Sequence, residues 1–241
     1  MSNLSQYTGK IKIFLDIAER KSILDLAANP IIKGITTNPS LMKKAGVSNY
    51  KAYCLELLAH IHGLPISYEV FADDFENMRR QGLEIAEWGT NVYVKIPIMN
   101  SEGKSSIPLI EELSHRKVKL NVTAVLTLNQ VWEATRALRG GVPSILSVFA
   151  GRIADTGRDP MPLMSAASEI CAGTDKNIEL LWASSREALN VVQAELAGCQ
   201  IITVTPEIIK KMAGFNKDLH ALSLDTVKTF KADAEAAGYS L

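Results

Sequence analysis

The sequence predicts a (β/α)8 (TIM) barrel, an α/β fold, with one additional C-terminal helix. Short apolar runs alternate with longer segments of helical periodicity, and eight such runs occur in 241 residues. Strand–helix alternation implies parallel pairing, and barrels of this kind typically hold about 250 residues. We expect one domain over residues 1–241, with the barrel at about 11–217 and a helical extension at about 218–241. A doubly wound open sheet is the alternative, although no G-x-G-x-x-G follows the first strand.

Each expected strand is a short apolar run bounded by polar or turn residues. In chain order the strands are Ile11–Asp16, Gly34–Thr37, Ile66–Val70, Asn91–Pro97, Lys119–Leu126, Ser144–Phe149, Asn177–Ser184 and Gln200–Thr205.

Apolar residues three and four apart predict helices between these strands, for example at Leu128–Leu138 and Arg186–Leu196. Helix starts are signalled by Asp73-Asp74 before Phe75 and by Ser101 before Glu102. The stretch Asp218–Gly238 is predicted as a helix beyond the eighth unit. Such a helix must pack on its own barrel or on a neighbouring subunit.

Composition narrows the function classes. Equal numbers of basic and acidic residues, 26 each, argue against a nucleic-acid partner. Apolar runs are too short to cross a bilayer, and residues 1–10 lack a signal-peptide pattern. The three cysteines and four histidines lack metal-ligand spacing. We therefore expect a cytoplasmic protein with reduced thiols, no metal site and no membrane contact.

Lys95 lies in the middle of an apolar strand, Asn91-Val-Tyr-Val-Lys-Ile-Pro97. A lysine is almost never fully buried unless something stabilises it, and burial disfavours its charged form. A neutral amine at the end of a barrel strand is a nucleophile that can form a Schiff base with a carbonyl. Taken alone, the strand is equally compatible with an edge lysine whose ammonium is in solvent.

Polar residues gather at the C-terminal ends of seven of the eight expected strands, and active sites of these barrels lie on that face. The candidate site residues are Asp16, Thr36, Asn38, Glu69, Lys95, Asn121, Thr123, Ser147, Phe149, Arg152, Ser184 and Arg186. Any one of them alone is usually a cap or a turn residue. Buried polar groups cost free energy unless they are satisfied, so their accumulation at one end predicts an active site.

The residue types predict carbonyl chemistry. Lys95 would attack a ketone, and Glu69 would transfer protons through a water held by Thr123. Asp16 would take and return the proton of a substrate hydroxyl while a carbon–carbon bond breaks. Asn38 and Asn121 would hold substrate hydroxyls.

Arg152, Arg186 and Ser184 form an expected anion site at the ends of the sixth and seventh strands. The fork of guanidinium donors suits phosphate. Either arginine alone is more often part of a surface salt bridge, but their shared placement at one barrel end favours the anion site.

Several motifs resemble the transaldolase family, in its short branch that also includes fructose-6-phosphate aldolases. The matching segments are Gly34-Ile-Thr-Thr-Asn-Pro-Ser40, Val94-Lys-Ile-Pro97, Asn121-Val-Thr123, Gly151-Arg-Ile153 and Leu196-Ala-Gly-Cys199. The resemblance implies a transferase of aldehyde or ketone groups that uses the class I, Schiff-base mechanism without metal or cofactor. In that mechanism Lys95 forms the Schiff base, Asp16 transfers a proton, and Glu69 with Thr123 holds a water. It also implies sugar phosphate substrates, the pentose phosphate pathway and a homo-oligomer such as a pentamer or decamer.

Four positions favour group transfer over free aldol cleavage. Aldolase-type members of the family resemble this chain but carry glutamine at Glu69, tyrosine at Phe149, alanine at Ser147 and no asparagine at Asn121. A tyrosine hydroxyl would activate water and release the free ketone. Without that hydroxyl at Phe149, the dihydroxyacetone adduct should persist until an aldehyde acceptor arrives.

The chain departs from the family pattern near the expected anion site. Ser185 replaces an aromatic residue, and Trp182 replaces a small one. We interpret Trp182 as filling the barrel interior, because it shares the parity of Ser184. These departures make a sulfonated ketose, such as 6-deoxy-6-sulfofructose, an alternative substrate.

The leading hypothesis is a transaldolase that moves a dihydroxyacetone unit from fructose 6-phosphate or sedoheptulose 7-phosphate to an aldose phosphate. A fructose-6-phosphate aldolase is the second hypothesis. A catalytically silent barrel with a binding or assembly role is the third. The fourth is a phosphate-binding isomerase, which would not need Lys95 inside a strand.

Overall fold

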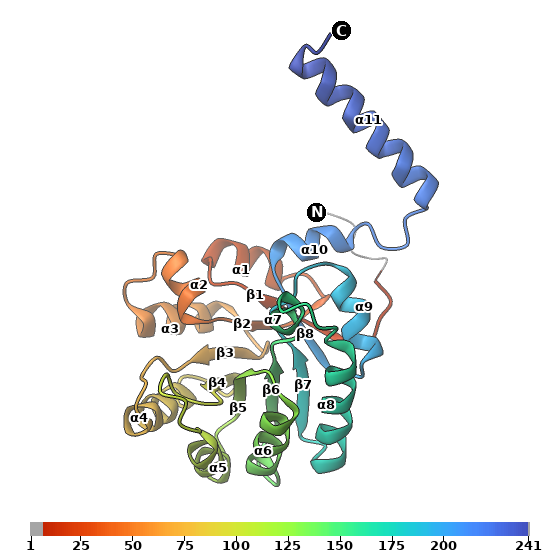
Figure 1. Ribbon diagram of the computed structural model, residues 1–241. Coiled ribbons are helices and arrows are strands. Elements are labelled where there is room, and N and C mark those ends of the chain that lie inside the picture. The colour runs from red at the N-terminus through yellow and green to blue at the C-terminus, as the bar shows by residue number, and fades with distance from the viewer. Residues whose placement is uncertain (1–6, 241) are drawn as a thin grey trace.

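Eight parallel strands form a closed barrel in the computed structural model, which describes residues 7–240. β1 pairs with both β2 and β8, and this closure confirms the predicted barrel and excludes the open sheet. Helices surround the strands on the outside (Figure 1). The strands are β1 Lys12–Asp16, β2 Ile32–Thr36, β3 Ile66–Glu69, β4 Val92–Pro97, β5 Leu120–Val125, β6 Ser144–Val148, β7 Ile178–Trp182 and β8 Ile201–Val204.

The helices follow the predicted alternation, and α6 has the predicted bounds. In order they are α1 Arg20–Ala27, α2 Pro39–Lys44, α3 Tyr50–His60, α4 Phe75–Ala86, α5 Ile107–His115, α6 Leu128–Leu138, α7 Ala150–Asp155, α8 Met161–Thr174, α9 Leu189–Leu196, α10 Pro206–Met212 and α11 Leu219–Ala237.

One of the two predicted helix starts is correct. Asp74 caps α4 by accepting a hydrogen bond from the backbone N–H of Asn77 at 2.9 Å. The start predicted at Ser101 is wrong, because the Ser101 backbone N–H and hydroxyl donate to Asp73 instead. A turn at Gly103, with φ of 77°, follows, and α5 begins only at Ile107. A serine can bind a distant carboxylate as well as a helix end, and the local sequence does not separate the two.

β2 begins at Ile32, two residues before its predicted start at Gly34. Gly34 lies inside the barrel, where a Cβ atom would come within 2.5 Å of the Phe14 ring. The glycine therefore makes room for the Phe14 ring rather than marking the start of the strand.

Strand alternation separates two apolar layers. Phe14, Ile145, Leu181 and Ile201 belong to a small cluster inside the barrel, whereas Trp182 belongs to the large cluster that includes residues of the surrounding helices. The prediction that Trp182 fills the interior is wrong. Ser184 has a φ of 63°, so the alternation breaks after β7 and parity counted back from Ser184 points the wrong way.

The C-terminal helix α11 confirms the predicted extra helix and leads away from the barrel (Figure 1). Its N-cap is Asp218 and its C-cap is Gly238, as the predicted bounds require. None of its residues is buried, and Phe230 is 67% exposed. Packing on its own barrel, one of the two expected partners, is thus excluded. Within residues 7–240, no helix is long and apolar enough to cross a membrane.

Candidate active site

A cavity of about 90 Å³ opens at the C-terminal ends of the strands. It is lined by Asp16, Thr36, Asn38, Lys95, Thr123, Ser147, Phe149, Arg152, Leu181, Ala183, Ser184 and Thr203. Nine of the twelve candidate residues are therefore brought together around it. The other three are Glu69, Asn121 and Arg186, and each contacts a residue of the lining.

Lys95 lies in β4, between β3 and β5, and only 7% of its surface is exposed. The predicted burial is confirmed, and the edge-strand alternative is wrong. Its Nζ lies 3.0 Å from Oε2 of Glu69 and donates a hydrogen bond to the carbonyl of Thr37 at 3.2 Å. The ion pair and the hydrogen bond compensate part of the cost of burying the amine.

Asp16 ends β1 beside this pair. Loss of water contact raises the pKa of the Asp16 carboxyl above its usual value. The positive charge of Lys95 and a hydrogen bond from the Thr36 hydroxyl, 3.0 Å from Oδ1, act in the opposite direction. The negative charge of Glu69 adds to the upward shift. The charges of Lys95 and Glu69 therefore both act on the Asp16 carboxyl.

A hydrogen-bond network holds Asn121 in place below the cavity. The Asn121 amide donates to the Ser67 hydroxyl at 2.9 Å, and its oxygen accepts from the Ser147 hydroxyl at 2.7 Å. Asn121 is fully buried and is not part of the cavity lining. It orients Ser147 rather than reaching into the cavity itself.

The Thr123 hydroxyl is buried without a hydrogen-bond partner among the residues the structure describes. Buried polar atoms are nearly always satisfied, so this hydroxyl is available to a water or a ligand hydroxyl. Thr123 lines the cavity, as Lys95 does. Its position fits the prediction that it holds a water.

The two arginines differ in their surroundings. The guanidinium of Arg152 lies 5.0 Å from the centre of the Phe149 ring, at the edge of the cavity. Arg186 donates to the Ser184 hydroxyl at 3.0 Å and to both carboxylate oxygens of Asp155. The hydrogen-bonded carboxylate of Asp155 raises the pKa of Arg186. The Arg186 guanidinium therefore stays charged, but it is already paired with Asp155. The predicted grouping of Ser184 with Arg186 is correct, whereas the pairing with Asp155 gave no signal in the sequence.

Two local features shape the elements that carry the cavity lining. A Cβ atom on Gly151 would lie 1.7 Å from the carbonyl oxygen of Ser184, so only glycine lets α7 approach the end of β7. Asn38 uses its side-chain oxygen to cap α2 through the N–H of Leu41 at 2.9 Å. Asn38 therefore has a structural role in addition to its place in the cavity lining.

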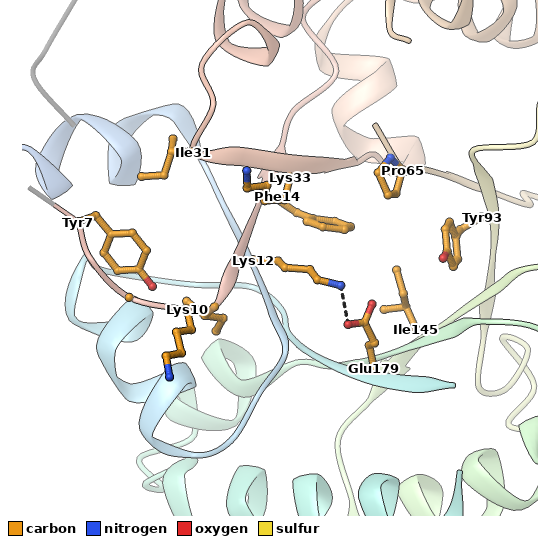
Figure 2. A pocket seen from close by; sticks show the side chains of 12 residues that line it. Tyr7, Lys10, Lys12, Phe14, Ile31, Lys33, Pro65, Tyr93, Ile145 and Glu179 are labelled. Carbon is orange, nitrogen blue, oxygen red and sulfur yellow. Dashed lines mark hydrogen bonds and ion pairs between the residues drawn. The ribbon is translucent and has the colours of Figure 1, made fainter. Parts of the chain in front are cut away.

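A second cavity, of about 480 Å³, lies at the opposite end of the barrel (Figure 2). There Lys12 pairs with Glu179 at 2.7 Å, and 48% of the Lys12 side chain is exposed, against 8% for Lys95. Two lysine–glutamate pairs thus join strands of the barrel, Lys12–Glu179 at this end and Lys95–Glu69 at the other. Of these two lysines, only Lys95 is buried, with the carboxyl groups of Glu69 and Asp16 beside it.

Sequence reasoning missed Thr203, which lines the cavity from β8 and contacts Thr36. β8 was the strand without an assigned polar residue. The signal was available, because Thr203 follows the inward-facing Ile201 by two residues.

Comparisons with known proteins identify one family. The family model described as Transaldolase/Fructose-6-phosphate aldolase matches residues 13–241. Proteins named "Probable transaldolase" from Methanococcus maripaludis strain C7 and from Hyphomonas neptunium are each 35% identical to the chain. The first alignment covers 94% of this chain and 98% of the relative, and the second covers 95% and 99%.

A solved structure supports the fold alone. Orotidine 5'-monophosphate decarboxylase from Metallosphaera sedula matches with a TM-score of 0.54 at 15% identity, over 83% of this chain and 90% of that chain. The family model and the relatives, in contrast, extend over nearly the whole sequence. The chain belongs to the transaldolase and fructose-6-phosphate aldolase family and is an enzyme of that class.

Proposed function

We propose that this enzyme is a transaldolase that transfers a dihydroxyacetone unit through a Schiff base on Lys95. The observation that carries the proposal is the buried Lys95 amine, 3.0 Å from Glu69 and in one cavity with Asp16. A buried amine with a proton acceptor in contact is suited to attack a ketone.

In the first half of the reaction, the neutral Lys95 amine adds to the C2 carbonyl of the donor ketose. Loss of the carbinolamine oxygen as water requires a proton, which Glu69 supplies directly or through a water at the Thr123 hydroxyl. The product is an iminium ion that can accept an electron pair.

In the second half, Asp16 takes the proton of the C4 hydroxyl while the C3–C4 bond breaks. The electron pair of that bond moves into the iminium, and the aldehyde product leaves. The remaining three-carbon enamine then attacks an acceptor aldehyde, and Asp16 returns its proton to the new hydroxyl. Water adds back to C2 of the resulting iminium, the C2–Nζ bond breaks, and the product ketose leaves the free Lys95 amine. The donor hydroxyls are held by Thr36, Asn38 and Ser147, while Asn121 orients Ser147.

The proposed donors are fructose 6-phosphate or sedoheptulose 7-phosphate, with an aldose phosphate as acceptor. The anionic tail would bind at Arg152 and Ser184, with Arg186 beyond them. Because Asp155 already neutralises part of the charge of Arg186, a singly charged sulfonate tail on a ketose is the alternative.

Phe149 supports transfer over free aldol cleavage. Its ring lines the cavity and contacts Arg152, and it offers no hydroxyl that could activate water at the adduct. The three-carbon adduct on Lys95 would therefore resist hydrolysis until an aldehyde acceptor binds.

We also propose that the functional form is a homo-oligomer. The exposed apolar residues of α11, which include Leu219, Val227 and Phe230, need a partner surface. A second copy of the chain would supply it, since the helix extends away from its own barrel (Figure 1).

Product analysis tests the proposed transfer. With fructose 6-phosphate and erythrose 4-phosphate together, we expect sedoheptulose 7-phosphate and glyceraldehyde 3-phosphate. Without the acceptor, turnover should stop after the first cleavage. The variant K95M should form neither product, while K12M, which changes the exposed lysine of the other pair, should retain activity. Steady release of dihydroxyacetone without acceptor would instead establish an aldolase.

A further inference from the structure

Three strands that meet at the closure of the barrel carry a chain of hydroxyl groups that ends on Asp16. Thr203 on β8 and Thr36 on β2 lie on either side of β1, and their hydroxyl oxygens are 2.6 Å apart. The Thr36 hydroxyl also lies 3.0 Å from Oδ1 of Asp16. Thr36 is 3% exposed and Thr203 4% exposed, so water competes little for these contacts.

The number of protons on each group determines which hydroxyl donates in this series of hydrogen bonds. A threonine hydroxyl has one proton to donate and can accept in return. When Asp16 is ionised, the Thr36 proton points to the carboxylate, so the short contact requires Thr203 to donate to Thr36. When Asp16 holds a proton, both hydroxyls can reverse. The orientation of both hydroxyl groups therefore depends on the protonation state of Asp16.

The backbone of Thr203 is itself anchored. The Ser185 hydroxyl donates to the Thr203 carbonyl at 2.9 Å. Ser185 is the position at which the chain departs from the aromatic residue expected from the family resemblance. The small side chain and its hydroxyl thus fix the segment that carries Thr203.

We propose that Thr203 is a positioning residue that acts through Thr36 to keep the Asp16 carboxylate oriented and ready to accept a proton. The proposal rests on the proposed function, in which Asp16 takes the proton of the substrate hydroxyl. Hydrogen bonds in a series strengthen one another, so a donor two groups away still stabilises the carboxylate. Without Thr203, Thr36 is free to turn its proton elsewhere.

The other charged groups around Asp16 set the background for this effect. Lys95 on β4 favours the ionised carboxyl, and Glu69 on β3 disfavours it. Arg152 of α7 also lines the cavity. None of these groups changes in a Thr203 variant, so a shift in the titration of Asp16 reports on the hydroxyl chain.

Two variants isolate the hydroxyl. Thr203→Val keeps the shape and removes the donor, whereas Thr203→Ser keeps the donor. In T203V the acid limb of the kcat/KM profile should move to higher pH by about half a unit, which lowers kcat/KM about threefold below the limb. T203S should retain the wild-type limb, and both variants should form the same amount of borohydride-reduced adduct on Lys95.

A direct titration separates this proposal from the proposed function. The Asp16 carboxyl resonance, followed by carbon NMR in the protein without sugar, should titrate about half a unit higher in T203V and unchanged in T203S. Thermal unfolding of each variant shows that the fold is retained. An unchanged Asp16 titration in T203V, or an equal shift in T203S, would overturn the role of Thr203. Absence of an adduct in the wild type would refute the proposed function and leave the NMR result intact.

Discussion

At the scale of single residues, the strand pattern predicted where the side chains of the site lie. It did not predict which side chains contact one another. The buried Lys95, the neighbouring Asp16 and the cavity position of Thr123 followed from where each strand ends. The Asp155–Arg186 pair did not, because it joins side chains 31 positions apart in the sequence. Pairing of this kind depends on the three-dimensional approach of α7 and β7.

The pH dependence of cleavage should follow Asp16. Its pKa is raised mainly by desolvation, so the carboxyl becomes ionised at a higher pH than that of an exposed aspartate. Because the ionised form accepts the proton, the cleavage rate should fall as the pH falls through this raised value. Single-turnover cleavage measured across the pH range checks the prediction. Asp16→Asn should abolish cleavage but still allow adduct formation on Lys95, and loss of both would contradict the assigned role.

Phe149 should decide the fate of the three-carbon adduct. Phe149→Tyr introduces a hydroxyl into the cavity lining, where it can activate water against the adduct. We expect the release of free dihydroxyacetone from fructose 6-phosphate to rise by about a hundredfold, the lower end of the general acid–base range. Phe149→Met, which adds no hydroxyl, is the control. An equal rise in both variants would show that a change of side chain at position 149, and not the added hydroxyl, raises the release.

At the scale of elements, Gly151 of α7 lets this helix pack against the residues that follow β7. Gly151→Ala places a Cβ against the Ser184 backbone carbonyl, which cannot move aside as a side-chain end can. We expect the free energy of unfolding to fall by about 2–3 kcal/mol and the affinity for a phosphorylated ketose to fall with it. Denaturant titration and KM measure the two effects.

Gly173 offers the matched control for that substitution. It lies within α8, and a Cβ there would meet nothing within 4 Å. Gly173→Ala should therefore leave stability unchanged or raise it by up to about 1 kcal/mol. If both alanine variants behave alike, the close approach at Gly151 is not a structural requirement.

Helices and strands were predicted correctly where the apolar pattern extended over many residues. Prediction failed where one residue was compatible with two local structures. The bounds of α6 and the caps of α11 were correct because each combines a long apolar pattern with clear end residues. The serine at position 101 was misinterpreted because it binds a distant aspartate. The parity of Trp182 was misassigned because the backbone turns at Ser184. Both errors arise from backbone or long-range geometry that a single sequence does not encode locally.

At the scale of the whole molecule, closure of the barrel followed from the count of eight strand–helix units, and α11 was left without a partner in its own chain. Phe230→Glu should dissociate the proposed oligomer, because it places a charge in the apolar stripe of α11. Lys228→Glu makes a larger charge change on the opposite face of the helix and should leave the assembly intact. Sedimentation velocity of the three proteins measures the outcome, and a monomeric wild type would refute the assembly.

The central claim is the Schiff base on Lys95. Its most direct test is borohydride reduction of the enzyme with fructose 6-phosphate, followed by mass spectrometry of the peptides. The account predicts a three-carbon adduct on Lys95 and none on Lys12, the exposed lysine at the other end of the barrel. An adduct formed only with a sulfonated ketose would keep the mechanism and change the substrate. An unmodified Lys95 with every ketose would contradict the account.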